Sequence, residues 1–228
     1  MNMKYSPELA TAYTNRREQM SHTDKPFFDE LEKIGVKGKS VIDLGCGPGR
    51  HARIIKSLGA ARVVGVDINE KMVELAKHAT SDNDIHFVVA DGQSLPLENR
   101  SADIVVSMYV VMYFPDSQKV FTEISRVLKD DGHFVGVFNI AKVEPGFEHL
   151  ANQQMPIRLG EGDSSIVVQN LIKTSEEIES AIRGAGLVII EKKEVEDPMA
   201  QIDESFADKS RVHKQATMFV LQKNSSVK

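Results

Sequence analysis

The chain has 228 residues, with 28 Lys and Arg against 33 Asp and Glu, and a formal net charge of −5 at pH 7. This balance excludes a strongly basic protein that coats nucleic acid, although it does not exclude an enzyme that acts on RNA. Hydrophobic residues make up 41% of the chain and glycine adds 15 residues, which excludes disorder as the main state. A chain of this length can bury a large core within one domain.

The chain contains one cysteine, Cys46, so it forms neither an intrachain disulfide nor a four-cysteine zinc site. We therefore expect a reducing, cytoplasmic setting. Residues 1–20 lack the apolar core that a secretory signal needs, and no uncharged apolar run reaches about 18 residues. We expect no export and no membrane segment.

The N-terminal segment predicts two helices ahead of a sheet. Ser6 and Pro7 are typical of an N-cap and a first helical position. Apolar residues between Pro26 and Ile34 fall on one side of a second helix. We expect residues 1–35 to form a helical cap.

Strand-like and helix-like segments then alternate from about residue 26 to residue 139, which predicts βα units and a parallel sheet. The strands are mostly continuous β-branched runs, as expected where both faces of a sheet are covered. The clearest helix begins after Asp116, a favourable N-cap residue, and shorter helices follow the first two strands. The expected strands are residues 41–44, 63–66, 86–90, 103–107 and 134–138.

Residues 139–173 interrupt this alternation. The segment contains one strand-like piece, residues 166–168, and is long for a connection within a compact domain. We expect residues 139–173 to form a lid.

The last part of the chain, residues 174–228, predicts one helix and a pair of strands. Thr174 and Glu177 form the pattern of a capping box, and Gly186 can close the helix that follows. The strand-like residues 187–190 and 216–221 have no helix between them, so we expect them to pair antiparallel. The prediction is a single α/β domain with a seven-stranded, mostly parallel sheet, helices on both faces and an antiparallel last strand.

Residues 41–49 combine a strand, a glycine-rich turn and the start of a helix. Such a turn can present N–H groups at a helix N-terminus, so we expect an anionic group to bind there. Asp67 ends the next strand, 22 residues after Gly45, where an acidic side chain can accept both hydroxyls of a ribose. A glycine turn alone also fits plain packing of a strand against a helix. The acidic residues at successive strand ends favour a nucleoside cofactor.

The glycine spacing separates two groups of nucleoside-binding enzymes. Nicotinamide-dependent dehydrogenases place their third glycine three positions after the second, and Arg50 occupies that position here. Gly45, Gly47 and Gly49 alternate instead, and Asp43 lies two residues before them. This arrangement resembles the first motif of the class I S-adenosylmethionine-dependent methyltransferases. The resemblance covers residues 36–140 and continues through residues 66–67, 89–97, 103–108 and 123–134.

The resemblance implies a Rossmann-like cofactor-binding core at residues 36–140, with S-adenosyl-L-methionine as the cofactor. It implies that Asp67 binds the ribose, that Asp91 and Gly92 lie at the adenine, and that the glycine turn borders the methionine portion. The residues that it assigns to the cofactor site are Asp43, Gly45, Cys46, Gly47, Gly49, Asp67, Ile68, Met72, Asp91, Gly92, Ser107 and Met108.

The absence of several known motifs reduces the range of possible methyl acceptors. The only thiol lies inside the glycine turn, which argues against cytosine C5 methylation through a cysteine nucleophile. Residues 107–114 lack the Asp/Asn-Pro-Pro-Tyr/Phe motif of the enzymes that methylate exocyclic amines of DNA and RNA. We recognise neither the paired glutamates of protein arginine methyltransferases nor the magnesium-binding carboxylates of catechol methyltransferases, so no metal is expected.

The remaining resemblance is to the small-molecule branch, the type 11 or ubiquinone-menaquinone methyltransferase-like enzymes. It implies in-line transfer of a methyl group to a nitrogen, oxygen or carbon nucleophile of a small-molecule acceptor, with no nucleic-acid or membrane partner. The sequence is compatible with a homodimer. Two alternatives stay open: a methyltransferase that acts on RNA or protein, and a regulatory protein that binds the cofactor without turnover.

Three residues are candidates for a catalytic group. Tyr113 follows the fourth strand, where ligands usually meet an α/β sheet, although ordinary packing of an apolar loop also explains it. The same holds for Tyr109 and Met112. His149 and His213 lie in the irregular later segments that we expect to cover the acceptor, so either is a candidate base.

Overall fold

The computed structural model describes residues 24–159, 166–196, 200–203, 205–207 and 209–224. The helix predicted at Ser6 and Pro7, and the first 23 residues of the predicted cap, lie outside these residues. Among the residues described, no helix is both long enough and apolar enough to cross a membrane.

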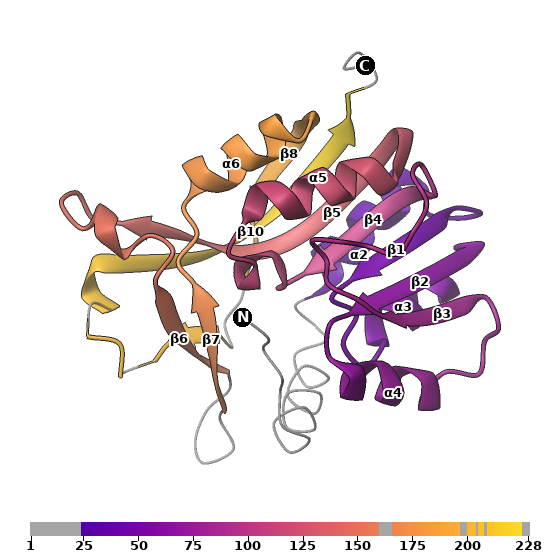
Figure 1. Ribbon diagram of the computed structural model, residues 1–228, viewed down its shortest axis with the longest axis horizontal. Coiled ribbons are helices and arrows are strands. Elements are labelled where there is room, and N and C mark those ends of the chain that lie inside the picture. The colour runs from indigo at the N-terminus through magenta and orange to yellow at the C-terminus, as the bar shows by residue number, and fades with distance from the viewer. Residues whose placement is uncertain (1–23, 160–165, 197–199, 204, 208, 225–228) are drawn as a thin grey trace.

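Seven strands form a large sheet in the order β3-β2-β1-β4-β5-β10-β8 (Figure 1). Neighbours in the first five positions are parallel, whereas β10 is antiparallel to both β5 and β8. The α/β fold with an antiparallel last strand is therefore confirmed. The strands are β1 Ser40–Leu44, β2 Arg62–Asp67, β3 Ile85–Val89, β4 Ala102–Met108, β5 Leu128–Val143, β8 Leu187–Glu194 and β10 Val212–Lys223.

The first four predicted strands match within one residue at each end, but β5 is much longer than predicted. At its C-terminal end the reason is β10, which pairs with β5 from Val212 opposite Val143 to Gln222 opposite His133. At its N-terminal end Leu128 pairs with Ala102 of β4. A long antiparallel ribbon therefore extends beyond the parallel part of the sheet. Nothing in the local sequence of β5 marks this extension, because it depends on a strand about 80 residues later in the chain.

Helices cover both faces of the large sheet. They are α2 Lys25–Ile34, α3 Arg50–Ser57, α4 Glu70–His78, α5 Ser117–Val127 and α6 Ser175–Gly184, with 3₁₀ turns η2 Val111–Tyr113, η3 Glu148–Leu150 and η5 Lys209–Arg211. In Figure 1, α5 and α6 lie side by side in front of the sheet and α2 lies behind it. The predicted N-caps are present, since Asp116 Oδ1 accepts from the Lys119 N–H at 3.0 Å and Thr174 Oγ1 from the Glu177 N–H at 3.3 Å. Consecutive apolar residues of β1 are buried because both faces of the sheet are covered.

A second, three-stranded antiparallel sheet has the order β7-β6-β9 and lies below β5 and β10 in Figure 1. Its strands are β6 Gln154–Leu159, β7 Ile166–Leu171 and β9 Ala200–Ile202. Buried Met155 and Ile157 pack with Leu150, Ile172 and Val212 in a small core of its own. The sequence predicted only part of β7. That residues 139–173 act as a lid stays a prediction.

Lys173 links this small sheet to the main domain. Its side chain is only 1% exposed, and Nζ donates to Asn152 Oδ1 at 2.6 Å, Glu177 Oε1 at 2.6 Å and the Pro115 carbonyl at 3.1 Å. A buried ammonium is tolerated only when such partners replace its lost water. The Glu177 carboxylate bonds Lys173 and Ser117 Oγ, so only the Thr174 half of the predicted capping box is formed.

Replacing Lys173 with Met should lower the free energy of unfolding by about 3 kcal/mol, because the partly buried Glu177 carboxylate and the Pro115 carbonyl lose a charged donor. Urea denaturation followed by circular dichroism measures this loss. The control is Lys71→Met, which removes the exposed Lys71–Glu74 pair and should cost no more than about 1 kcal/mol. Equal losses in the two variants would contradict the linking role of Lys173.

Candidate functional site

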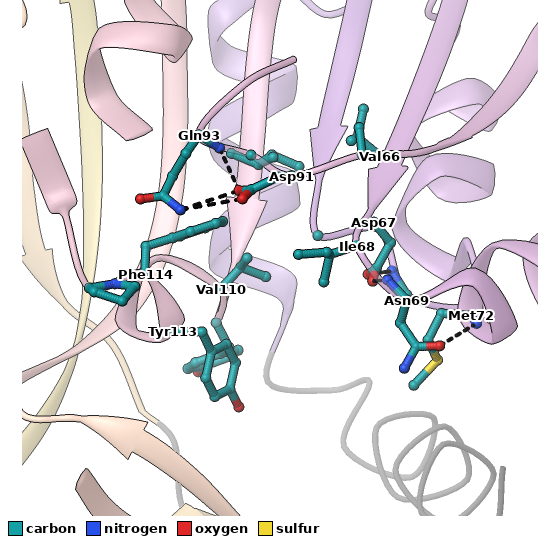
Figure 2. Close-up of a pocket in the computed structure, with 17 residues that line it drawn as sticks. Val66, Asp67, Ile68, Asn69, Met72, Asp91, Gln93, Val110, Tyr113 and Phe114 are labelled. Atoms are coloured by element: carbon teal, nitrogen blue, oxygen red, sulfur yellow. Dashed lines mark hydrogen bonds between the residues drawn. The ribbon is translucent and has the colours of Figure 1, made fainter. Parts of the chain in front are cut away.

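A cavity lies at the carboxyl edge of the large sheet. The described residues that line it lie at the ends of β1 and β2 and in the segments after β1, β2, β3 and β4, so four segments far apart in sequence meet there. Figure 2 shows Val110, Tyr113 and Phe114 on one side of the cavity, and Asp67, Asn69 and Met72 on the other. Ligands of open α/β sheets bind at this edge, beyond the ends of the parallel strands.

The glycine turn brings backbone into the wall of this cavity. Gly45 and Gly47 both line it, with φ of 77° and 50°, a region that side chains other than glycine disfavour. A Cβ on Gly45 would lie 2.2 Å from Val110 Cγ2, so the close approach of the two loops requires glycine there. A Cβ on Gly47 would meet no atom of the described residues within 4 Å, so among these residues the backbone at Gly47 is open to a ligand.

The sequence predicted that N–H groups of the turn bind an anion, but in the structure three of them bond to other groups of the protein. The Gly45 and Cys46 N–H groups donate to the Val66 carbonyl at 2.7 and 3.0 Å. The Gly47 N–H donates to Asp67 Oδ2 at 2.9 Å. Because these donors are already bonded within the protein, they do not form a cradle for a phosphate. Their effect is to tie the turn to the end of β2.

Asp67 is the acidic group that faces the cavity from β2. Its Oδ2 accepts from Gly47 and its Oδ1 accepts from the Asn69 N–H at 2.9 Å. Burial raises the pKa of Asp67, while the backbone N–H groups of Asn69, Gly47 and Ile68 act in the opposite direction. A carboxylate oxygen has room for more than one hydrogen bond, so Asp67 can still accept from two ligand hydroxyls.

The loop after β3 supplies a second carboxylate. Asp91 Oδ1 accepts from the Gln93 N–H at 2.9 Å, and Gln93 Nε2 lies 3.4 Å from each carboxylate oxygen (Figure 2). Ile68, which is 43% exposed, lies between the two carboxylates in Figure 2, and Phe114 lines the cavity on the other side of Asp91. The site thus combines acidic hydrogen-bond acceptors with apolar surface for a flat ring.

Seven of the residues assigned from the sequence line this cavity, and five do not. Those that line it are Gly45, Gly47, Asp67, Ile68, Met72, Asp91 and Gly92; those that do not are Asp43, Cys46, Gly49, Ser107 and Met108. Asp43 and Ser107 are buried inside their strands, and burial raises the pKa of the Cys46 thiol well above its ordinary value.

Some of the candidate catalytic residues line the cavity and others do not. Tyr113 lines the cavity together with Tyr109, whereas Met112 is buried and does not line it. His149 and His213 are both exposed, and neither lines the cavity. The structure therefore brings only the tyrosines to this site.

Sequence reasoning missed Asn69, Gln93, Val110 and Phe114, which also line the cavity. Asn69 had a local signal, since it is the N-cap of α4 and accepts from the N–H groups of Lys71 and Met72. Gln93 lies within residues 89–97, which the resemblance covers, and bonds Asp91 in the same loop. Val110 and Phe114 had no local signal, because their position depends on how separate loops pack together.

Asp43 lies beneath the glycine turn and is only 2% exposed. It accepts from the Ala52 N–H at the start of α3, and its Oδ2 has no hydrogen-bond partner among the described residues. Burial raises the pKa of Asp43 from 3.8 to about 6, the positive charge of His51 opposes this, and the negative charge of Asp67 adds to it. A carboxylate at a helix N-terminus is favourable, but here it is costly to ionise.

Because its folded pKa is raised, Asp43 contributes stability that is present below pH 3.8 and lost as pH rises through about 6. We therefore expect the free energy of unfolding of Asp43→Asn, measured relative to wild type, to rise by about 3 kcal/mol as the pH goes from about 4 to about 7. Urea denaturation across this range measures the difference. Asp84→Asn is the exposed control: the Lys56 ammonium lowers the pKa of Asp84, so its effect has the opposite sign. Parallel pH profiles for wild type and Asp43→Asn would contradict the prediction.

Comparison with known proteins agrees with this geometry. Residues 42–136 match a family model described as a methyltransferase domain. A demethylmenaquinone methyltransferase from Lactococcus lactis is 31% identical over 179 residues, which is 71% of each chain. A sterol 24-C-methyltransferase from Gibberella zeae is 29% identical over 187 residues, or 76% of this chain and 48% of the relative. The chain thus spans about half the length of that relative.

A solved structure gives the same fold. The S-adenosylmethionine-dependent methyltransferase from Mesorhizobium loti has a TM-score of 0.63 and 20% identity, covering 88% of this chain and 98% of that chain. Taken with the domain match and the demethylmenaquinone methyltransferase relative, this shows that the chain belongs to the class I S-adenosylmethionine-dependent methyltransferases, whose cofactor is S-adenosylmethionine.

Proposed function

We propose that the chain transfers the methyl group of S-adenosylmethionine to a nitrogen, oxygen or carbon nucleophile of a small molecule. The observation that carries this proposal is the cavity at the carboxyl edge of the sheet, where the glycine turn, Asp67 and Asp91 meet the loop that bears Tyr109 and Tyr113. The names of two relatives, which act on a sterol and on demethylmenaquinone, support a small acceptor.

The residues of the cavity fit the cofactor. Asp67 has oxygen lone pairs for two ribose hydroxyls, and Ile68 and Phe114 offer apolar surface to a purine ring. The open backbone at Gly47 leaves space for the methionine portion. In this assignment Asp91 and Gly92 lie at the edge of the adenine. Asp43 acts indirectly, by holding the start of α3 beneath the turn.

The charge of the cavity also fits. Its described lining contains two carboxylates, Asp67 and Asp91, and no Lys, Arg or His. The sulfonium and the ammonium of S-adenosylmethionine are both cationic, so a cavity with acidic walls attracts it and disfavours a phosphate-bearing nucleotide. The bonded N–H groups of the glycine turn favour the same choice.

S-adenosylmethionine supplies a methyl group that is already activated by the positive sulfur. The task left to the chain is to hold the acceptor in line with that methyl group and to exclude water. Tyr109 and Tyr113 line the cavity after β4, and we assign them to orienting the acceptor. A neutral amine needs no protein base, whereas an alcohol or a carbon acid needs one; Tyr113 is then the candidate at the site.

Asp67→Ala should weaken S-adenosylmethionine binding by about 30- to 150-fold, because losing both ribose hydrogen bonds costs about 2 to 3 kcal/mol. Isothermal titration calorimetry measures the dissociation constant. Asp67→Asn keeps one acceptor oxygen and should fall between Asp67→Ala and wild type, and Asp84→Ala, at an exposed position, should bind normally. Unchanged binding by Asp67→Ala would refute the assignment of Asp67 to the ribose.

The reaction itself is tested with methyl-labelled S-adenosylmethionine and a cell extract separated by size. Wild-type protein should label the metabolite fraction, and Asp67→Ala should label it much less. Label in RNA or protein would overturn the small-molecule acceptor. Normal binding without transfer to any fraction would instead identify a regulatory protein that binds the cofactor.

A further inference from the structure

A second cavity adjoins the first. The two cavities share Tyr113 and Pro115, and the rest of the second one comes from the small sheet and the loop before it. The strand β7 packs against η2. Tyr113 is the last residue of η2 and lines both cavities. A molecule in the second cavity would therefore contact the same tyrosine as a cofactor in the first.

The lining of the second cavity is polar but uncharged. Four of its residues are primary amides, Asn152, Gln154, Gln169 and Asn170, and Tyr113, Pro115 and Leu171 complete the described lining. Each amide offers both donor and acceptor groups without a charge. A carboxylate or phosphate placed there would lose water and find no cation among these residues, whereas a hydroxyl or carbonyl group would find partners.

Asn170 gives the strongest indication of a missing ligand group. Its side chain is 3% exposed, and Oδ1 has no hydrogen-bond partner in the described part of the chain. Buried amide oxygens are nearly always bonded, because leaving one unpaired is costly. A hydroxyl or N–H donor on a ligand in the cavity that Asn170 lines would satisfy this requirement.

Other parts of the wall are held in place before any ligand binds. Asn152 Oδ1 accepts from buried Lys173, which also binds the Pro115 carbonyl, so one ammonium fixes two lining residues. Asn152 has φ of 63°, a left-handed conformation that Asn adopts more readily than most residues other than glycine.

We propose that the second cavity binds the methyl acceptor and that this acceptor is an uncharged molecule bearing hydroxyl or carbonyl groups. The inference rests on the proposed function, since it supplies the acceptor for that reaction. Asn170 and its neighbouring amides bind the acceptor's polar groups, and Tyr113 lies at the junction with the cofactor cavity.

The first arm of the test determines the charge of the labelled product. Metabolites labelled by the wild-type protein are passed at neutral pH over anion- and cation-exchange resins. The labelled product should pass through both. Retention on either resin would overturn the proposal of an uncharged acceptor. Absence of any labelled product would contradict the proposed function instead, and the second arm would still decide on binding.

The second arm measures binding without turnover. Saturation-transfer NMR is recorded with excess S-adenosylhomocysteine and two matched probe pairs: hydroquinone with 2,5-dihydroxybenzoate, and cyclohexanone with 4-oxocyclohexanecarboxylate. The neutral members should bind and the carboxylates should not. Stronger signals from the carboxylates, or no signal from either neutral probe, would overturn the proposal.

The variant Asn170→Leu connects both arms to the cavity. It should abolish the signals of the neutral probes and lower transfer at limiting extract by about three- to tenfold, while S-adenosylmethionine affinity stays unchanged. Asn83→Leu, an exposed amide before β3 at the opposite edge of the sheet, should change neither. If Asn170→Leu transferred the methyl group and bound the probes as well as wild type does, the assignment would be overturned. The melting temperature of the variant shows whether it is folded.

Discussion

The functional edge of this protein depends on the attachment of the glycine turn to the end of β2. The Val66 carbonyl accepts from the Gly45 and Cys46 N–H groups, and the Asp67 carboxylate accepts from the Gly47 N–H. These bonds fix the backbone of the turn and the acidic side chain in one arrangement. They also remove the donors that would otherwise hold a phosphate. The turn consequently supplies close backbone approach, and Asp67 supplies the acceptors for a nucleoside.

This arrangement brings carboxylates together in a partly buried region. Burial raises the pKa of Asp67 and of Asp43, and the negative charge of Asp67 further raises the pKa of Asp43. Such groups weaken the folded state when they ionise, because charge is removed from water. The positive charge of S-adenosylmethionine attracts these carboxylates, so binding of the cofactor favours their ionised form.

Buried Lys173 connects the cofactor side of the protein to its second sheet. It bonds Asn152 at the start of the small sheet, Pro115 in the wall shared by both cavities, and Glu177 on α6. Ion pairs of this kind fix relative position more than they add stability, since desolvation offsets much of the attraction. The small sheet is therefore held in a defined position beside Tyr113, where the acceptor is proposed to bind.

The sequence by itself determined the large sheet and the cofactor family. Continuous β-branched runs, N-caps at Asp116 and Thr174, and a glycine spacing followed by acidic strand ends are local signals that persist in any compact arrangement of βα units. The pairing of β5 with β10, the pairing of β6 with β9, and the positions of Phe114 and Asn170 were decided only by tertiary structure. The paired strands lie tens of residues apart in the chain, with Val143 opposite Val212 and Ile157 opposite Ile202, so no local pattern encodes their pairing. Tertiary packing also decided that five residues of the glycine turn and neighbouring strands, which matched the family's motifs, do not line the cavity.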